Sequence, residues 1–138
     1  MCDAKVLSDV RADLGNCSGE FGVIGEALFL RMFRERPAVQ DNFPKYKGQT
    51  VDKLKSSGLL SAHGKKVVEL LVKLVENADK PALTQMVNDF IALHKKYSIP
   101  YDILKATKSE VVATLGEYGM KSGSWGPFLD FFFTAIAY

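Results

Sequence analysis

Two histidines carry most of the chemistry that this sequence could perform. His94 ends a row of apolar side chains at helical spacing, and His63 lies in the middle of a second row, with Val67 one turn after it. The first row consists of Met86, Val87, Phe90 and Ile91. One imidazole on an apolar face is usually a core residue with satisfied hydrogen bonds. Two of them, on separate helices, indicate a ligand held between those helices.

A bare metal ion fits these surroundings poorly. A structural zinc site needs four ligands, and no Cys, Asp or Glu lies at ligand spacing beside either histidine. The chain also lacks HExxH, CxxC and the Glu-x-x-His motif of di-iron bundles. A porphyrin iron needs only one protein ligand, because its ring supplies the equatorial nitrogens. We therefore predict a flat apolar cofactor with a central metal, between one histidine below and one above.

The composition is that of an ordinary globular protein. The chain has 138 residues, enough for one domain with its own core, of which 47% are apolar and 25% charged. The net charge is +2 and the lysines are spread along the chain, so we expect no nucleic-acid partner. No apolar run approaches the about 20 residues of a membrane span, so we expect no membrane partner. We predict a single domain over residues 1–138.

The two cysteines, Cys2 and Cys17, indicate a reducing compartment. They lie near the ends of one expected helix, where a rise of about 1.5 Å per residue separates them by about 22 Å. A disulfide needs Cα atoms within about 7 Å, so both thiols should be free. The start of the chain lacks the long apolar core of a signal peptide. We expect a cytoplasmic protein.

Helical periodicity accounts for nearly the whole chain, and no sustained apolar–polar alternation indicates a strand. We predict an all-α protein with six to seven helices around a pocket. The main helices are expected over residues 4–17, 19–36, 50–77 and 101–118, with one carrying His94 before Pro100 and a last one from residue 124. A short helix follows Pro37. The expected capping residues are Ser18, Thr50 and Ser124.

Glycines and aromatic residues predict two kinds of contact. Gly25 and Gly64 lie inside expected helices, where glycine costs about 1 kcal/mol against alanine, so each needs a packing reason such as a close helix crossing. Phe131 and Phe133 add apolar surface to the last helix, which predicts self-association into a homo-oligomer. Burial of both rings against the first helix is the alternative.

Taken together, these motifs resemble the globin family over nearly the whole chain. RERPAVQDNF resembles the short third helix and its corner, so Phe43 matches the phenylalanine that packs on the haem edge. LLSAHGKKVVELL resembles the distal helix, with His63 as the distal histidine and Val67 over the haem. FIALHKKYSIP resembles the proximal helix, with His94 as the iron ligand. The family usually carries a tryptophan near Leu14, and this chain does not.

The resemblance implies haem b, iron protoporphyrin IX, as the cofactor. His94 would bind the iron through one nitrogen and donate its other N–H to a backbone carbonyl one turn earlier. His63 would donate a hydrogen bond to bound dioxygen. The apolar cradle would be formed by Val67, Leu70, Phe90, Leu93, Ile99 and Leu104, with Ile103 as the alternative to Leu104. The haem propionates would meet Lys66 and Tyr97.

Phe29 is expected one turn after the Gly25 crossing, where it would lean over the haem beside His63. Globins often have a leucine there, so the larger ring would exclude water and tighten oxygen binding. The alternative is that Phe29 packs against Phe33 or Phe43 and never meets the ligand.

The function implied by this resemblance is reversible dioxygen binding for storage or transport, with CO and NO as further ligands. The expectation is not an enzyme, although a haem peroxidase or a nitric-oxide dioxygenase on the same fold is an alternative from another class. No arginine lies on the row of the distal histidine and no reductase domain is present to recycle iron. A haem-based sensor in which His63 itself ligates the iron is a further alternative.

Overall fold

Helices form the secondary structure of residues 2–138, which are the residues that the structure, a computed structural model, describes; no strand occurs among them. The helical segments in this range are α1 (Ala4–Leu14), α2 (Phe21–Glu35), α3 (Pro37–Gln40), α4 (Val51–Ser57), α5 (Leu59–Asn77), α6 (Ala82–Lys96), α7 (Tyr101–Ala106), α8 (Lys108–Glu117) and α9 (Trp125–Ile136). Among the described helices, none is both long and apolar enough to cross a membrane.

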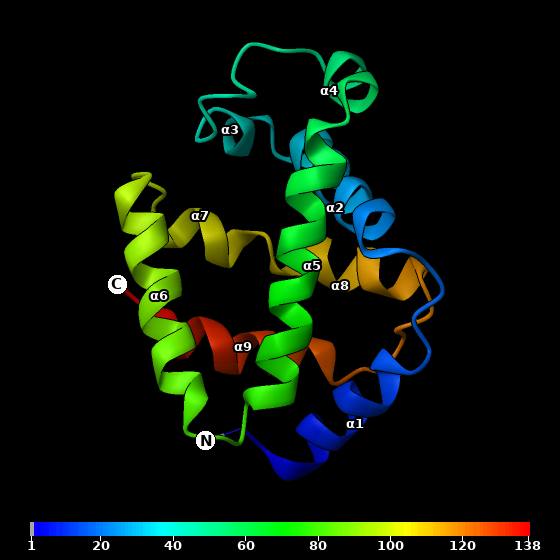
Figure 1. Ribbon diagram of the computed structural model, residues 1–138, viewed down its shortest axis with the longest axis vertical. Coiled ribbons are helices and arrows are strands. Elements are labelled where there is room, and N and C mark those ends of the chain that lie inside the picture. The colour runs from blue at the N-terminus through cyan, green and yellow to red at the C-terminus, as the bar shows by residue number, and fades with distance from the viewer. Residues whose placement is uncertain (1) are drawn as a thin grey trace.

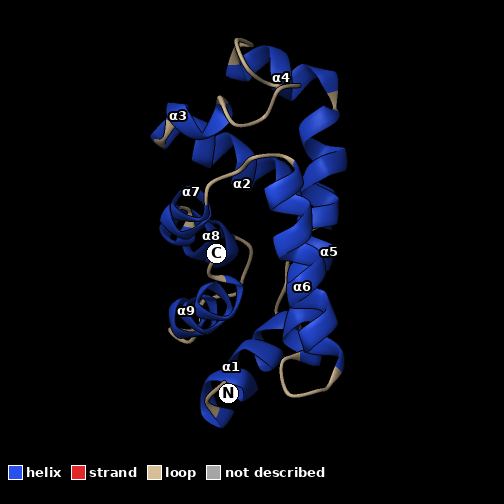
Figure 2. Ribbon diagram, turned by 90° about the vertical axis from the view of Figure 1, so that its left-hand side faces the viewer, coloured by secondary structure: helices blue, strands red, loops and turns tan. Residues whose placement is uncertain are grey.

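The long helix α5 is the axis of the arrangement. In Figure 1 it runs down the middle of the molecule, with α2 crossing behind its upper half and α1 lying near its lower end. In the view of Figure 2, α5 and α6 stand on one side, while α7, α8 and α9 stand on the other. The two expected histidine-bearing helices, α5 and α6, meet near the loop that joins them and stand apart beyond it (Figure 1).

The crossing of α2 with α5 is made by the two glycines predicted to need a packing reason. A Cβ added to Gly25 would fall within 2.5 Å of the Cα, carbonyl carbon and oxygen of Gly64. A Cβ added to Gly64 would lie 2.5 Å from the Gly25 Cα. Real Cβ atoms essentially never approach other heavy atoms within 3.0 Å. Only glycine at both positions lets the two backbones touch, so the predicted close crossing is confirmed.

Two of the expected long helices are each divided. The stretch expected as one helix over residues 50–77 changes direction at Gly58, whose φ of 75° is in the left-handed region that favours glycine. The stretch expected over 101–118 is divided at Thr107, whose hydroxyl donates to the carbonyl oxygen of Leu104 at 2.6 Å. That bond turns the hydroxyl back onto the preceding turn, as threonine does at helix ends.

The capping predictions have different outcomes. Thr50 caps α4 as predicted, since its Oγ1 accepts the N–H of Lys53 at 3.1 Å. Ser18 does not cap α2; that helix begins after Glu20, which makes no side-chain cap. Ser124 occupies the cap position of α9, but its side chain makes no cap hydrogen bond and donates to α1 instead.

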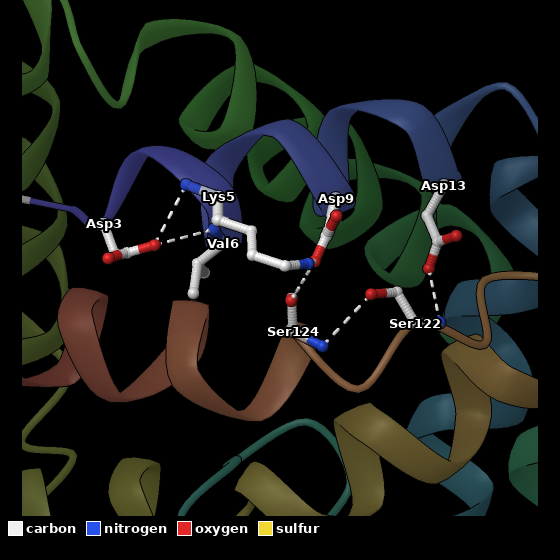
Figure 3. A network of polar contacts seen from close by, with 7 residues as sticks. All are labelled: Asp3, Lys5, Val6, Asp9, Asp13, Ser122 and Ser124. Atoms are coloured by element: carbon white, nitrogen blue, oxygen red, sulfur yellow. Dashed lines mark hydrogen bonds and ion pairs between the residues drawn. The ribbon is translucent and has the colours of Figure 1, made fainter.

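Helix α1 is joined to the start of α9 by hydrogen bonds to two of its carboxylates. Asp13 is buried and accepts hydrogen bonds from the backbone N–H of Ser122 at 2.7 Å and from Nε1–H of Trp125 at 2.8 Å. Ser124 donates to Asp9 at 2.7 Å, so two carboxylates of α1 hold the same turn (Figure 3). Charge-assisted bonds of this kind are stronger than neutral ones, so this turn is fixed firmly to α1.

The last helix buries one of the two rings on which the predicted self-association depends. Phe133 is 7% exposed and belongs to the main core, and Phe131 is half-buried beside Phe128, with ring centroids 6.2 Å apart. Phe133 therefore supplies no free apolar surface and Phe131 supplies only part of its ring, so self-association stays a prediction. The expectation for the cysteines is confirmed within the described residues, because Cys2 and Cys17 are both free.

Candidate functional site

His94 lies in the last turn of α6 with one of its nitrogens fixed. Its Nδ1 is 2.8 Å from the carbonyl oxygen of Phe90, and a carbonyl only accepts, so Nδ1 carries the proton. This is the hydrogen bond expected from the sequence. The imidazole also stacks on the Phe90 ring at 4.0 Å between centroids, and Phe90 meets Phe132 edge-on at 5.0 Å. The ring is therefore held in one orientation, and its Nε2 keeps a lone pair.

His63 lies on α5 inside a group of aromatic rings. The Phe29 ring is 4.7 Å from the imidazole centroid, and the Phe43 ring is 5.9 Å away and nearly perpendicular to it. Phe29 is 2% exposed, so its position is set by packing from all sides. The Phe29 ring also lies 5.7 Å from Phe33 and 5.8 Å from Phe43, so it packs within the aromatic group as well as beside His63. Its contact with a bound ligand stays a prediction.

Tyr46 is the residue that sequence reasoning missed. It is 4% exposed, and its hydroxyl oxygen lies 3.0 Å from Nδ1 of His63. It comes from the loop after α3, where Pro44 and Gly48 interrupt any periodicity that could have assigned it to a face. The only signal in the sequence was its position three residues after Phe43.

The electrostatics keep both imidazoles neutral. Burial lowers the pKa of His63 below its usual value, and positive charge on Lys66 and Lys45 lowers it further. Burial also lowers the pKa of His94, while its hydrogen bond to Phe90 acts in the opposite direction. A neutral imidazole is the form that can offer a lone pair to a metal.

The apolar residues expected to line the pocket fall into two groups. Val67 and Ile103 pack against the cluster of buried residues that contains Phe29, whereas Leu70 and Leu104 pack against the cluster of α1, α6 and α9. The structure thus places Ile103, the alternative, with Phe29. Ile99 is buried, where it follows the end of α6.

Three of the residues expected near the cofactor lie at the surface. Leu93 is 50% exposed and Tyr97 is 56% exposed, on either side of His94 in the sequence. Lys66, one turn before Leu70 on α5, is exposed as well. Lys96 places its ammonium 5.7 Å from the centre of the Tyr97 ring. Among residues 2–138, no group of three or more His, Cys, Asp or Glu side chains is placed to hold a metal ion.

Known proteins resemble this chain in sequence and in fold. The family model described as Globin matches residues 26–136. Globin CTT-IV of Chironomus thummi thummi is 28% identical, over 83% of this chain and 78% of its own length. Globin-1 of Liolophura japonica is 38% identical, over 54% of this chain and 49% of its own length. The crystal structure of ferric myoglobin from Aplysia limacina superposes with a TM-score of 0.85 at 15% identity, covering 99% of this chain and 97% of the other, which shows a shared fold.

Proposed function

This chain belongs to the globin family, and we propose on that premise that it binds haem b through His94 and holds dioxygen reversibly beside His63. The observation that carries the proposal is the hydrogen bond from Nδ1 of His94 to the carbonyl oxygen of Phe90. It fixes the tautomer in which Nε2 is a ligand atom, and it raises the basicity of that atom.

The donor set fits a haem iron better than a bare ion. One neutral imidazole with a free Nε2 is what a porphyrin iron requires from the protein on its proximal side. The second imidazole, His63, lies among the apolar rings of Phe29 and Phe43 on α5. Bound haem supplies an iron with an open coordination position at which a diatomic gas binds.

On the proximal side, the residues of α6 hold and orient the ligand atom. Phe90 fixes the plane of the His94 ring by stacking and fixes its tautomer through the backbone carbonyl. Leu93 and Tyr97, both exposed beside His94, offer apolar and aromatic surface to the cofactor. Lys66 and Tyr97 would meet the propionates, and Ile99 would close the pocket behind the proximal corner.

On the distal side, the chain supplies one polar group within an apolar wall. His63 would donate a hydrogen bond to dioxygen, which carries partial negative charge when it is bound. The rings of Phe29 and Phe43 lie beside this imidazole, and Val67 packs against the cluster that contains Phe29. Together these side chains would keep water away from the imidazole. A hydrogen bond in such dry surroundings is stronger than one in water. We propose storage or transport of dioxygen in the cytoplasm as the physiological role.

The experiment is reconstitution of the purified chain with haem, followed by visible spectra of the oxidised, reduced and CO-bound forms. A Soret band and a reversible oxygenated spectrum are expected. His94→Ala should lose most of the haem and regain it when free imidazole is added. The matched control is His63→Ala, which should keep its haem.

Unchanged haem retention and an unchanged spectrum in His94→Ala would exclude the ligand assignment. Sharp bands in the reduced form without added gas would show that both histidines bind the iron. That result would replace the proposed oxygen store with a sensor.

A further inference from the structure

Tyr46 has a polar group that the proposed function leaves unused. Its hydroxyl is buried with the rest of the side chain, and within residues 2–138 its hydrogen-bond partner is Nδ1 of His63. A buried phenol without a partner would cost about 1–3 kcal/mol, so this contact has to be a real hydrogen bond in one direction or the other. The direction decides which nitrogen of His63 carries the ring proton.

The chemistry of the two groups sets that direction. Burial raises the pKa of Tyr46, so the phenol keeps its proton, and burial lowers the pKa of His63, so the imidazole is neutral. A neutral imidazole has one donor nitrogen and one acceptor nitrogen, while a phenol can donate only through its single O–H. If Nδ1 donated to the phenol oxygen, the buried O–H of Tyr46 would have no acceptor. The arrangement that satisfies both groups has Tyr46 donating to Nδ1.

We propose that Tyr46 is a positioning residue, which fixes His63 as the tautomer protonated on Nε2 and holds the ring in one rotamer. The proposal rests on the proposed function in one respect, because Nε2–H is then the group offered to dioxygen. Nε2 is separated from Nδ1 by Cε1 and points in a different direction, and no described residue makes a hydrogen bond to it. The ring proton is thereby directed away from the loop of Tyr46 and is free for a ligand.

Hydrogen bonds and ring packing fix the loop that carries Tyr46. Gln40 is buried, and its Nε2 donates to the carbonyl oxygens of Tyr46 at 2.6 Å and of Gln49 at 2.8 Å. The backbone N–H of Tyr46 donates to the carbonyl oxygen of Phe43 at 2.8 Å. The Tyr46 ring packs 5.7 Å from that of Phe43 and 6.4 Å from that of Phe29. The same aromatic rings that surround His63 therefore immobilise its hydrogen-bond donor.

The test is nitrogen NMR of the full chain labelled with 15N-histidine, in its CO-bound diamagnetic form and without haem. The chain has only two histidines, so the ring spectrum contains two sets of signals, and His63→Ala, which should keep its haem, assigns them. In the wild type, His63 should show a protonated Nε2 and an unprotonated Nδ1 that is shifted by accepting a hydrogen bond. In Tyr46→Phe the Nδ1 signal should move to the position of an acceptor without a donor.

Tyr101→Phe is the matched control, since its hydroxyl donates to the carbonyl oxygen of Phe133 at 2.8 Å, in another half-buried contact. It should lose similar stability and leave the His63 signals in place. In Tyr46→Phe, dioxygen should dissociate about two- to tenfold faster, the range that loss of one ordinary hydrogen bond implies. CO should dissociate at nearly the wild-type rate, because little charge develops on it.

A proton on Nδ1 of His63 in the wild type would overturn the proposal, even if Tyr46→Phe did not fold. Unchanged His63 signals in a folded Tyr46→Phe protein would overturn it as well. The proposed function fails by a separate observation, the absence of haem uptake, and the tautomer can still be determined in the haem-free chain.

Discussion

The contact between Gly25 and Gly64 makes Gly25→Ala the most sharply defined perturbation of this fold. The added Cβ would fall within 2.5 Å of three backbone atoms of Gly64, and ordinary van der Waals contact begins at 3.4 Å. Helices α2 and α5 would have to separate locally by about 0.9 Å or more. Backbone atoms cannot rotate away as a side chain can, so the strain spreads over both helices.

The expected magnitude follows from two opposing effects. Alanine in place of a helical glycine gains about 1 kcal/mol, and overpacking costs about 1–3 kcal/mol, occasionally more. A clash between two backbones lies at or beyond the upper end, so Gly25→Ala should lower the free energy of unfolding by about 2 kcal/mol. In a domain of this size that loss corresponds to a fall in Tm of about 7 °C.

Gly22→Ala on the same helix is the matched control. Its Cβ would meet the Oγ of Ser61 at 2.8 Å and the carbonyl oxygen of Ser61 at 3.5 Å, and the hydroxyl can turn aside. This variant should therefore keep most of the helical gain and lie within about 1 kcal/mol of the wild type.

The assay is urea unfolding followed by far-ultraviolet circular dichroism. Haem occupancy must be equal in all variants, because a ligand that binds the native state raises the apparent stability. A Gly25→Ala protein as stable as Gly22→Ala would refute the backbone contact and with it the reason given for both glycines.

Three further perturbations test other parts of the structure. Phe29→Leu and Phe29→Ala should speed dioxygen dissociation and autoxidation; wild-type rates in both would make Phe29 a core residue only. Glu110 is 1% exposed, and although burial raises its pKa, hydrogen bonds from Arg36 and Ser109 hold that pKa below the usual 4.5. Its ionised form therefore contributes stability that is present above about pH 4.5 and is lost as the pH falls through the lower, folded-state pKa. In Glu110→Gln the free energy of unfolding should be about 1–2 kcal/mol lower at neutral pH and should fall less steeply as the pH is lowered. Urea unfolding at several pH values measures this, and an unchanged pH dependence would contradict it. Leu14→Trp should raise the unfolding free energy by about 0.5–2 kcal/mol, because Leu14 lines an apolar cavity of about 130 Å³ and the larger ring would fill it; a lower Tm would show that the cavity cannot accept the ring.

Periodicity was sufficient to place both histidines, because each lies on a regular helix whose apolar row is set by local spacing. It could not divide the helix expected over residues 50–77, since Gly58 permits a left-handed turn without requiring one. The break depends on α4 packing over the end of α5, and Leu54 of α4 is fully buried there. A sequence pattern carries no information on that packing.

Residue spacing could not predict the part of the site that lies on irregular backbone. Tyr46 reaches His63 because Gln40 holds the loop through two carbonyl groups, and no spacing rule connects these three residues. The choice between Ile103 and Leu104 stays open in the sequence for a related reason. Helix α7 is a short segment whose register is set by Pro100 before it and Thr107 after it, so the sequence left both residues open as pocket lining.

The bonds between α1 and α9 also have a consequence for the order of folding during synthesis. Asp13 and Asp9 find their partners 109 to 115 residues later in the chain. Until those partners leave the ribosome, Asp13 lacks both of its donors, Asp9 has only Lys5 of its own helix, and α1 can pack only against α5. Contacts of such large sequence separation form late because the intervening chain must first be ordered. We expect pulsed hydrogen exchange during refolding to protect α2 and α5 before α1; early protection of α1 would mean that it docks on α5 without help from the last helix.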